Sequence, residues 1–186
     1  MGPPPSVSPG ITRHQNPGHW AGVFSSKPSG FVIHGSRSGV VTRSRQQEYD
    51  GTRTYAENSL VTLPDGTTYY TGWNATIGDL QWSRHFDADK WGHHAGVDGV
   101  TRMGFEFAQA VISWNVTDGQ VAAWADCYKS YVVPRWGEYN LRATGVLSMH
   151  SQLPQGIRDG KTDVFSRDDY ARWNDLKARL TAAVGQ

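Results

Sequence analysis

Histidine is the side chain that most often binds transition metals and moves protons near neutral pH, and this sequence of 186 residues contains seven. His34 ends the apolar run of residues 31–33, and His150 follows a second strand-like run, residues 144–149. Asp163 comes after a loop that contains Pro and Gly. Two histidines and one carboxylate form a catalytic zinc set, because three protein ligands leave a fourth position for water. These three residues are candidate ligands, and a hydrogen-bonded core histidine is the alternative for His34.

Two further charged residues are candidates because of their local patterns. Glu106 alternates with Phe105 and Phe107, so a strand here places its carboxylate on the face opposite both rings. Lys161 precedes Asp163 by two positions. The alternatives are an exposed strand residue for Glu106 and a solvated loop residue for Lys161, since lysine is mostly exposed.

Short strands are expected to position these residues. Residues 31–34 predict a buried strand that ends at its histidine, and residues 104–108 predict another. The β-rich runs 59–63 and 67–71 flank a Pro-Asp-Gly turn, which is typical of a hairpin.

Helices are expected to follow the strands. Thr117 and Gln120 fit a capping box, and a looser helix start lies at residues 166–169. The polar stretch Thr42–Tyr55 is a surface helix at best. Each of the two later helices carries an apolar stripe: Val121, Trp124, Ala125, Tyr128 and Val132 in one, and Tyr170, Trp173, Leu176 and Leu180 in the other. Strands interleaved with helices predict an α/β or α+β domain.

Length and composition argue against several classes of protein. The length fits one domain, with a flexible tail expected at residues 1–20, the first ten rich in Pro, Gly and Ser, before a domain at residues 21–186. A net charge of +1 argues against a nucleic-acid binder. No apolar run approaches the roughly 20 residues of a membrane span, and no Sec signal peptide is apparent. The single cysteine, Cys127, excludes an internal disulfide, and we expect it to be buried as a small hydrophobic residue.

Several motifs occur in an order that resembles the type 2 N-acetylmuramoyl-L-alanine amidases, a family that includes phage endolysins, cell-wall-recycling amidases and peptidoglycan recognition proteins. The resemblance runs from about Phe31 to Trp173. It is carried by the segments Phe31-Val-Ile-His34-Gly-Ser, Asp65-Gly66 with Tyr69-Tyr70, His94-Ala-Gly96, Gly104-Phe-Glu106, Thr117 with Gln120, and His150 to Lys161-Thr-Asp163. It implies an α/β fold in which helices flank a central mixed β-sheet, with a zinc cleft at one edge.

The resemblance also implies roles for individual residues. His34, His150 and Asp163 match the zinc ligands, Lys161 matches the catalytic lysine, and Glu106 matches the carboxylate that some members use as general base. His94 matches a histidine that lines the substrate cleft. Trp73, Trp82 and Trp91 lie between the hairpin and His94, where an exposed indole could stack on a sugar or stem peptide. We count Trp91 and Asn58 as substrate-binding candidates.

These residue types suit hydrolysis of the amide between N-acetylmuramic acid and L-alanine. Amides resist neutral water, and a catalytic zinc lowers the pKa of its bound water to about 7 and polarises the carbonyl. Glu106 would carry the water's proton to the departing amine. Lys161 would stabilise the oxyanion.

The sequence departs from the family pattern at three places. Asp163 is followed by Val-Phe, where the family usually has Pro-Gly. Many members carry a His-Tyr pair where this chain has Asn58-Ser59-Leu60, so the tyrosine's role in activating water falls to Glu106 or is missing. His93 and His94 are adjacent, and the sequence leaves open which one faces the cleft.

The expected function is therefore a zinc-dependent (Zn2+) amidase that acts on bacterial peptidoglycan or muropeptides. The absence of a signal peptide fits a phage or prophage endolysin that accumulates in the host cytoplasm and acts on the wall after release. A cytoplasmic muropeptide-recycling amidase and a non-catalytic peptidoglycan-binding recognition protein are the alternatives, and unrelated histidines in another fold are a third. We expect a monomer with no nucleic-acid partner and no membrane insertion.

Overall fold

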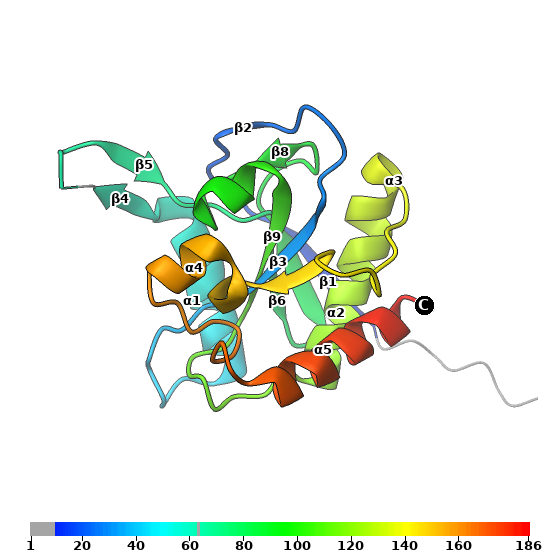
Figure 1. Ribbon diagram of the computed structural model, residues 1–186. Coiled ribbons are helices and arrows are strands. Elements are labelled where there is room, and N and C mark those ends of the chain that lie inside the picture. The colour runs from blue at the N-terminus through cyan, green and yellow to red at the C-terminus, as the bar shows by residue number, and fades with distance from the viewer. Residues whose placement is uncertain (1–9, 63) are drawn as a thin grey trace, which may run out of the picture.

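A six-stranded mixed β-sheet forms the centre of the computed structural model, which describes residues 10–62 and 64–186 (Figure 1). The strand order is β1-β7-β6-β9-β3-β10, and every neighbouring pair is parallel except the antiparallel pair of β6 and β7. The strands of this sheet are β1 (Thr12–Gln15), β3 (Gly30–Gly35), β6 (Ala75–Gly78), β7 (Gln81–Arg84), β9 (Arg102–Phe107) and β10 (Leu147–Met149). The predicted mixed sheet with flanking helices is confirmed.

The N-terminal boundary differs from the expected one. Residues 1–9 of the expected tail lie outside the described residues, but Thr12–Gln15 form β1 and pair in parallel with β7. Arg13 anchors this strand, since its guanidinium lies 2.6 Å from a carboxylate oxygen of Asp126. The run Thr-Arg-His-Gln is polar because an edge strand is half solvated, so hydrophobic patterning could not reveal it.

Five α-helical segments and three short helical turns cover the sheet within the described residues. They are α1 (Arg45–Asn58), α2 (Asp118–Cys127), α3 (Val133–Trp136), α4 (Pro154–Arg158) and α5 (Tyr170–Ala183), with the turns η1 (Gly96–Val100), η2 (Tyr128–Val132) and η3 (His150–Gln152).

Side-chain caps set where the longer helices begin. Thr117 and Gln120 form the predicted capping box at the start of α2, with nitrogen–oxygen distances of 3.0 and 3.1 Å. Ser44 and Gln47 form a second one at α1, within the stretch expected to be a surface helix at best. Because α1 also buries Tyr49, it belongs to the packed structure rather than to the surface alone.

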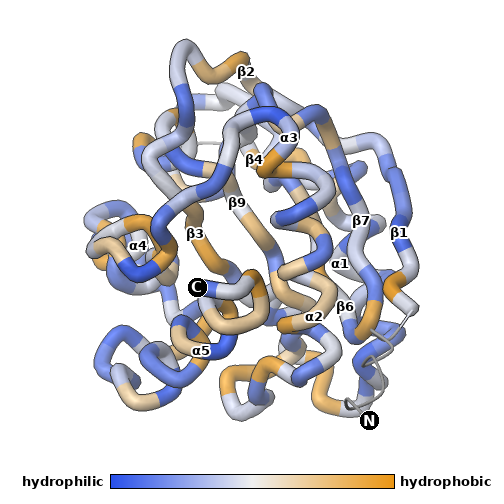
Figure 2. Tube along the Cα trace, turned by 90° about the vertical axis from the view of Figure 1, so that its right-hand side faces the viewer, coloured by the Kyte–Doolittle hydropathy of each residue, from blue (hydrophilic) through white to orange (hydrophobic). Residues whose placement is uncertain are grey.

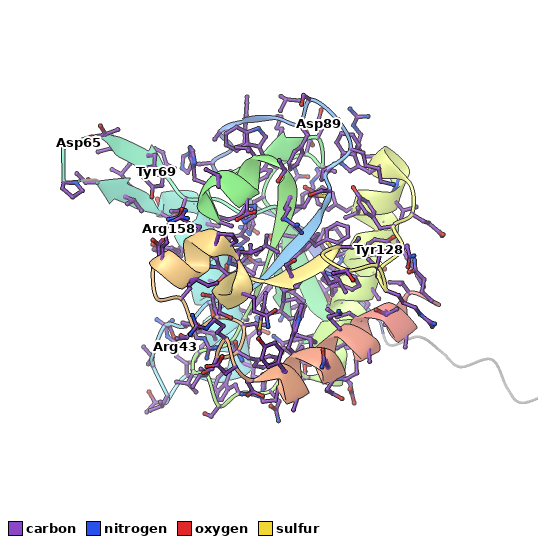
Figure 3. The ribbon with its side chains drawn as sticks, viewed as in Figure 1. Arg43, Asp65, Tyr69, Asp89, Tyr128 and Arg158 are labelled. Carbon is purple, nitrogen blue, oxygen red and sulfur yellow. The ribbon has the colours of Figure 1, made fainter. Side chains whose placement is uncertain are left out.

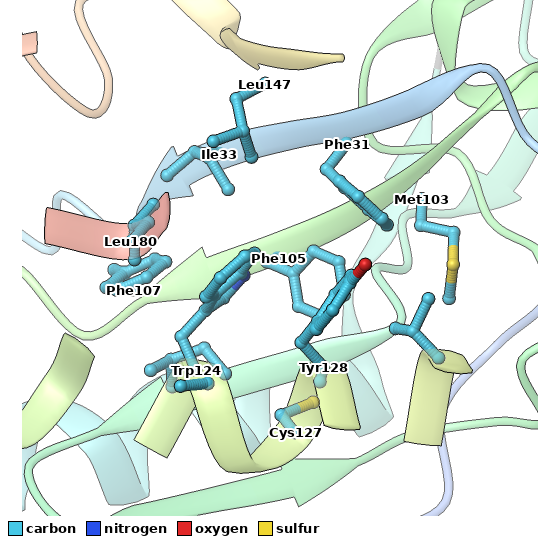
Figure 4. Packing of buried hydrophobic residues seen from close by; sticks show 14 of the residues in the cluster. Phe31, Ile33, Met103, Phe105, Phe107, Trp124, Cys127, Tyr128, Leu147 and Leu180 are labelled. Carbon is cyan, nitrogen blue, oxygen red and sulfur yellow. The ribbon is translucent and has the colours of Figure 1, made fainter. Parts of the chain in front are cut away.

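The hydrophobic core lies between one face of the sheet and the helices α2 and α5. Phe31, Ile33, Phe105 and Phe107 alternate along β3 and β9 and point toward this layer, as Figure 4 shows. The predicted helix stripes supply the other side, with Trp124, Tyr128, Trp173, Leu176 and Leu180 buried there and Cys127 buried beside them. Tyr170 is an exception, since it is exposed at the first turn of α5.

The opposite face of the sheet is covered more sparsely. Tyr49 of α1 packs over Gly78 of β6, and Val32 of β3 packs with Ala95 and Leu153. Figure 2 shows the hydrophobic part of β3 at the centre of the molecule and the hydrophilic β1 at its edge. The side chains of β3 and β9 that do not enter the main core therefore face a layer with room for a cleft.

Two small antiparallel pairs complete the fold. The predicted hairpin is present as β4 (Leu60–Thr62) and β5 (Thr68–Tyr70), and it projects from the body (Figure 1). Leu63 of the expected first strand lies outside the described residues. Figure 3 shows Asp65 at the outer turn, where its carboxylate accepts a hydrogen bond from the Thr67 amide, and Tyr69 nearer the body. The other pair is β2 (Gly22–Val23) with β8 (Lys90–Trp91).

No helix within residues 10–62 and 64–186 has both the length and the apolar character that a membrane span requires.

Candidate active site

Three parallel strands bring the candidate residues to one edge of the sheet. His34 of β3 pairs in register with Glu106 of β9, and His150 follows β10, whose last residue Met149 pairs with Ile33. The carboxyl ends of neighbouring parallel strands meet at the same edge, which is where open α/β sheets bind their ligands. The strand-end positions predicted for both histidines are therefore what brings them together.

His34, His150 and Asp163 form a compact triad of ligand atoms. The His34 Nδ1, His150 Nδ1 and Asp163 Oδ2 atoms lie 3.1 Å from one another in every pair. Ligands about 2.0–2.1 Å from a tetrahedral zinc ion lie roughly 3.3 Å apart, so this spacing fits that ion. The side chains are buried, with 3%, 5% and 8% of the respective residues exposed. The triad is a candidate metal centre.

The electrostatics of the triad also suit a cation. Burial lowers the pKa of His34 to about 4, so its ring is neutral near pH 7 and offers a lone pair. Burial acts to raise the pKa of Asp163, but its contacts with His150 and His34 outweigh burial and lower it. A neutral imidazole and an ionised carboxylate are the forms that a metal needs.

The third candidate ligand, Asp163, stands on a loop that Arg37 holds in place. The Arg37 Nη2 donates hydrogen bonds of 2.7 Å to the carbonyl oxygens of both Thr162 and Val164, the two residues that flank Asp163. The Asp163 carbonyl itself accepts from the Ser151 amide at 3.0 Å. Arg37 lies three residues after His34, so one strand end both supplies a ligand and fixes the loop that carries another.

Glu106 lies in the same cleft, on the side of β9 away from the core. Its carboxyl group is buried, with 8% of the residue exposed. Burial raises its pKa well above the ordinary value, the nearby charge of Asp163 raises it further, and Lys161 and Arg37 act in the opposite direction. The predicted alternative of an exposed strand residue is wrong. A raised pKa is typical of a group that takes up and releases a proton near neutral pH.

A cleft of about 470 Å³ joins these groups to solvent. Lys161 is exposed and lines this cleft together with His34, Glu106, His150 and Asp163. The five residues that the sequence predicts as ligands or catalytic groups therefore share one cavity.

His93 and His94 both line the cleft but make different contacts. The His94 Nδ1 lies 3.1 Å from the His34 Nε2, and the His94 Nε2 lies 3.1 Å from the carbonyl oxygen of Arg102. Burial, and secondarily the neighbouring His34, lower the pKa of His94 well below its ordinary value. His93 instead packs against Tyr69, with ring centroids 5.0 Å apart.

Two of the predicted substrate-binding residues lie outside this cleft lining. Asn58 is exposed at the end of α1, where its amide nitrogen donates to the carbonyl oxygen of Thr54. Trp91 is half-buried against the main core, and its indole packs on His93 with ring centroids 5.5 Å apart. The contact with His93 and the core is thus the one that the structure gives this indole.

The structure adds one aromatic cleft residue that the sequence analysis missed, Tyr55 of α1, and it places Trp73, one of the three candidate stacking indoles, beside it. Tyr55 and Trp73 line the cleft beside Glu106, and their rings stack with centroids 6.2 Å apart. A second cavity of about 310 Å³ continues past this pair toward Arg43 and the buried Glu48. The low apolar content of α1 hid Tyr55, because only the helix phase relative to the sheet shows which residues face the cleft.

The fold is that of the N-acetylmuramoyl-L-alanine amidases and peptidoglycan recognition proteins. A mutant endolysin from Bacillus subtilis is 18% identical, with a TM-score of 0.60 over 91% of this chain and 99% of that one. The endolysin N-acetylmuramoyl-L-alanine amidase LysCS from Clostridium intestinale is 14% identical, with a TM-score of 0.54 over 93% and 97%. The Drosophila peptidoglycan recognition protein SD is 12% identical, with a TM-score of 0.53 over 76% and 84%.

No protein-family model and no curated protein sequence matches the chain. At such low identities the solved structures establish the fold, and the activity has to be argued from the site. The fold expected from the order of the sequence motifs is confirmed by these structures.

Proposed function

We propose that this protein is a zinc-dependent N-acetylmuramoyl-L-alanine amidase that cleaves the amide between N-acetylmuramic acid and L-alanine of peptidoglycan. The observation that carries the proposal is the triad of His34, His150 and Asp163, whose ligand atoms are 3.1 Å apart in the same cleft as Glu106 and Lys161. The likeness to endolysins and amidases supports the choice of substrate.

The triad residues would hold the ion, which when bound supplies a Lewis acid for the scissile carbonyl and activates water. His34 and His150 contribute neutral nitrogens, and Asp163 contributes one negative charge, so the loaded site keeps a net positive charge.

Glu106 would move the protons of the reaction. Its carboxylate accepts a proton from the attacking water and delivers it to the nitrogen of the departing L-alanine. Burial excludes bulk water from around this carboxyl group, and the resulting rise of its pKa makes it a stronger base than an exposed glutamate.

Lys161 would stabilise the negative charge that develops on the carbonyl oxygen. It lines the cleft two positions from Asp163, and because its side chain is exposed, it carries its charge with little desolvation cost. A well-placed group of this kind is typically worth a few kcal/mol in the transition state.

The endolysins among the similar structures support action on the cell wall from a phage or prophage source. We therefore assign polymeric peptidoglycan as the first substrate to test. Soluble muropeptides are the substrate expected of a recycling amidase.

The decisive experiment is digestion of purified peptidoglycan with detection of newly freed N-terminal L-alanine. The wild-type protein loaded with zinc should release it, and a chelator should abolish the release. His150→Ala should be inactive, while Tyr170→Ala, an exposed position at the start of α5 that does not line the cleft, should retain activity. Binding to the wall with no release would favour a non-catalytic recognition protein, and neither binding nor release would refute a peptidoglycan function.

A further inference from the structure

A line of ring nitrogens joins the candidate metal centre to the backbone of β9. It starts at the carbonyl oxygen of Arg102, continues through Nε2 and Nδ1 of His94, and reaches Nε2 of His34, with each gap 3.1 Å. The other ring nitrogen of His34, Nδ1, belongs to the triad. One end of this line is therefore a hydrogen-bond acceptor, the carbonyl oxygen, and the other end is a candidate metal ligand.

The carbonyl oxygen of Arg102 determines where the protons lie. Because a carbonyl oxygen can only accept, the Nε2 atom of His94 must carry the hydrogen. A neutral His94 then has a bare Nδ1, so it accepts from Nε2–H of His34. That leaves Nδ1 of His34 without a hydrogen and with its lone pair directed at the triad, where Asp163 then accepts from Nδ1–H of His150 and not from His34.

We propose that His94 is a positioning residue that fixes the tautomer and the ring orientation of His34, so that His34 presents Nδ1 to the metal. The inference rests on the proposed metal centre, and it departs from the substrate-binding role expected for His94 from the sequence. Such outer partners of ligating histidines raise metal affinity by holding the ring in its ligating form.

The backbone around His94 is shaped to hold its ring in this position. Gly104 of β9 lies directly beneath it, and a Cβ atom at Gly104 would stand 2.7 Å from Cγ and 2.8 Å from Nδ1 of His94. Gly104 pairs in register with Val32, two residues before His34, so the ring reaches the ligand from the adjacent strand. The absence of a side chain at Gly104 is what allows the ring to lie flat against β9.

The neighbouring histidine provides an internal comparison. His93 lines the same cleft and is also half-buried, but its ring packs against Tyr69 and Trp91 and not against a ligand. If His94 positions His34, substitution of His94 should weaken zinc binding, whereas substitution of the adjacent His93 should not.

The first test reads the tautomers directly in the metal-free protein. Nitrogen-15 chemical shifts from long-range proton–nitrogen spectra at neutral pH distinguish a ring that carries its hydrogen on Nε2 from one that carries it on Nδ1. In the wild type both His34 and His94 should carry it on Nε2. A wild-type His34 with its hydrogen on Nδ1 would overturn the proposal.

The second test compares three variants by competition of zinc against a chromogenic chelator. His94→Leu should weaken zinc binding by roughly 10- to 100-fold. Asparagine has nearly the same shape as leucine but carries an oxygen that can accept a hydrogen bond from His34. His94→Asn should therefore recover much of the zinc affinity that His94→Leu loses. His93→Leu should bind zinc like the wild type.

The outcomes separate this inference from the proposed function. Equal losses in His94→Leu and His94→Asn would assign His94 a packing role and refute the inference. No loss in His94→Leu would show that His94 does not contribute to zinc binding and would also refute it. A wild-type protein that binds no zinc would refute the proposed metal centre, and the tautomer measurement would still decide what His94 does to His34.

Discussion

Glu106 is the residue in which activity and stability are most directly opposed. Its carboxyl group is buried near Asp163, and both features raise its pKa. A carboxyl group whose pKa is raised by folding binds protons more tightly in the folded state, so its contribution to stability is lost as the pH rises through the folded pKa. An ionised Glu106 therefore lowers the free energy of unfolding at neutral pH, although the proposed proton transfer requires the ionised form.

We predict that Glu106→Gln lowers kcat by roughly 100- to 10,000-fold, because the amide cannot take up the proton of water. The same variant, free of metal, should be more stable than the wild type at pH 7, since no charge has to be buried. Zinc affinity and urea unfolding should be measured beside the rate. A variant that loses stability as well as activity would show that Glu106 does not destabilise the folded protein at neutral pH.

The candidate ligands could be predicted from sequence, but several of their partners could not. His34 and His150 each end an apolar run, and Asp163 follows at the spacing that the family resemblance supplied. Arg37 carries no such signal, because a polar residue after a strand is typical of any loop. Its contacts depend on a segment about 125 positions later, which no local pattern encodes.

The loop that carries Lys161 and Asp163 shows how one element can depend on a distant residue. It has little regular structure of its own beyond the short helix α4, and the carbonyls beside Asp163 are held by Arg37. A charged donor shared between two carbonyls is stronger than a neutral hydrogen bond. The position of the third ligand therefore depends on Arg37.

We predict that Arg37→Leu destabilises the loop by about 1–3 kcal/mol, since the charge-assisted hydrogen bonds are lost. The Ser151 amide, which donates to Asp163, should exchange its hydrogen faster, and zinc affinity should fall. Arg158→Leu is the matched control, because Arg158 lies nearby on α4 and its guanidinium donates to Gln155 (Figure 3). An unchanged exchange rate of the Ser151 amide in Arg37→Leu would show that the loop is stable without Arg37.

Elements with a strong local signal were predictable, and elements defined by their neighbours were not. The hairpin has its turn residues, and α2 has its capping box, both readable from a few adjacent positions. Strand β1 is polar and short, and it exists because β7 offers an unpaired edge. Helix α1 is mostly polar, so its packed face becomes visible only against β6.

At the scale of the whole molecule, a bound metal should act as a stabiliser. Anything that binds only the folded state raises the free energy of unfolding, by about 4 kcal/mol at a free concentration 1,000-fold above Kd. For a domain of this length that corresponds to a rise of roughly 10 °C in Tm. Thermal unfolding with zinc and with a chelator should show this difference in the wild type and not in His150→Ala. An equal shift in both proteins would place the binding elsewhere.

Acid should destabilise the fold through a histidine that does not belong to the candidate metal centre, His85. His85 is buried, its Nε2 lies 2.8 Å from the Thr76 hydroxyl, and burial lowers its pKa from 6.5 to about 4. Between these pH values the unfolded chain binds more protons than the folded one, so stability rises with pH across this window and is lost as the pH falls.

We predict that the wild type loses up to about 3 kcal/mol more stability than His85→Gln between pH 6.5 and pH 4. Glutamine can still reach Thr76 but does not titrate, so it isolates the contribution of the imidazole. Urea unfolding of the metal-free proteins across this range measures the difference. Parallel stability curves for the two proteins would mean that His85 does not control the acid transition.

The proposed ligands also lie far apart along the chain, with 116 positions between His34 and His150 and 129 between His34 and Asp163. A metal ion that joins them closes a loop containing most of the polypeptide, as a long-range disulfide would. Such a closure cannot form until both distant segments have been synthesised and brought together, so the proposed ion would be captured late in folding. Once captured, it would act as a clasp, holding together the two pieces of a chain cut at an exposed loop such as the tip of the β4–β5 hairpin.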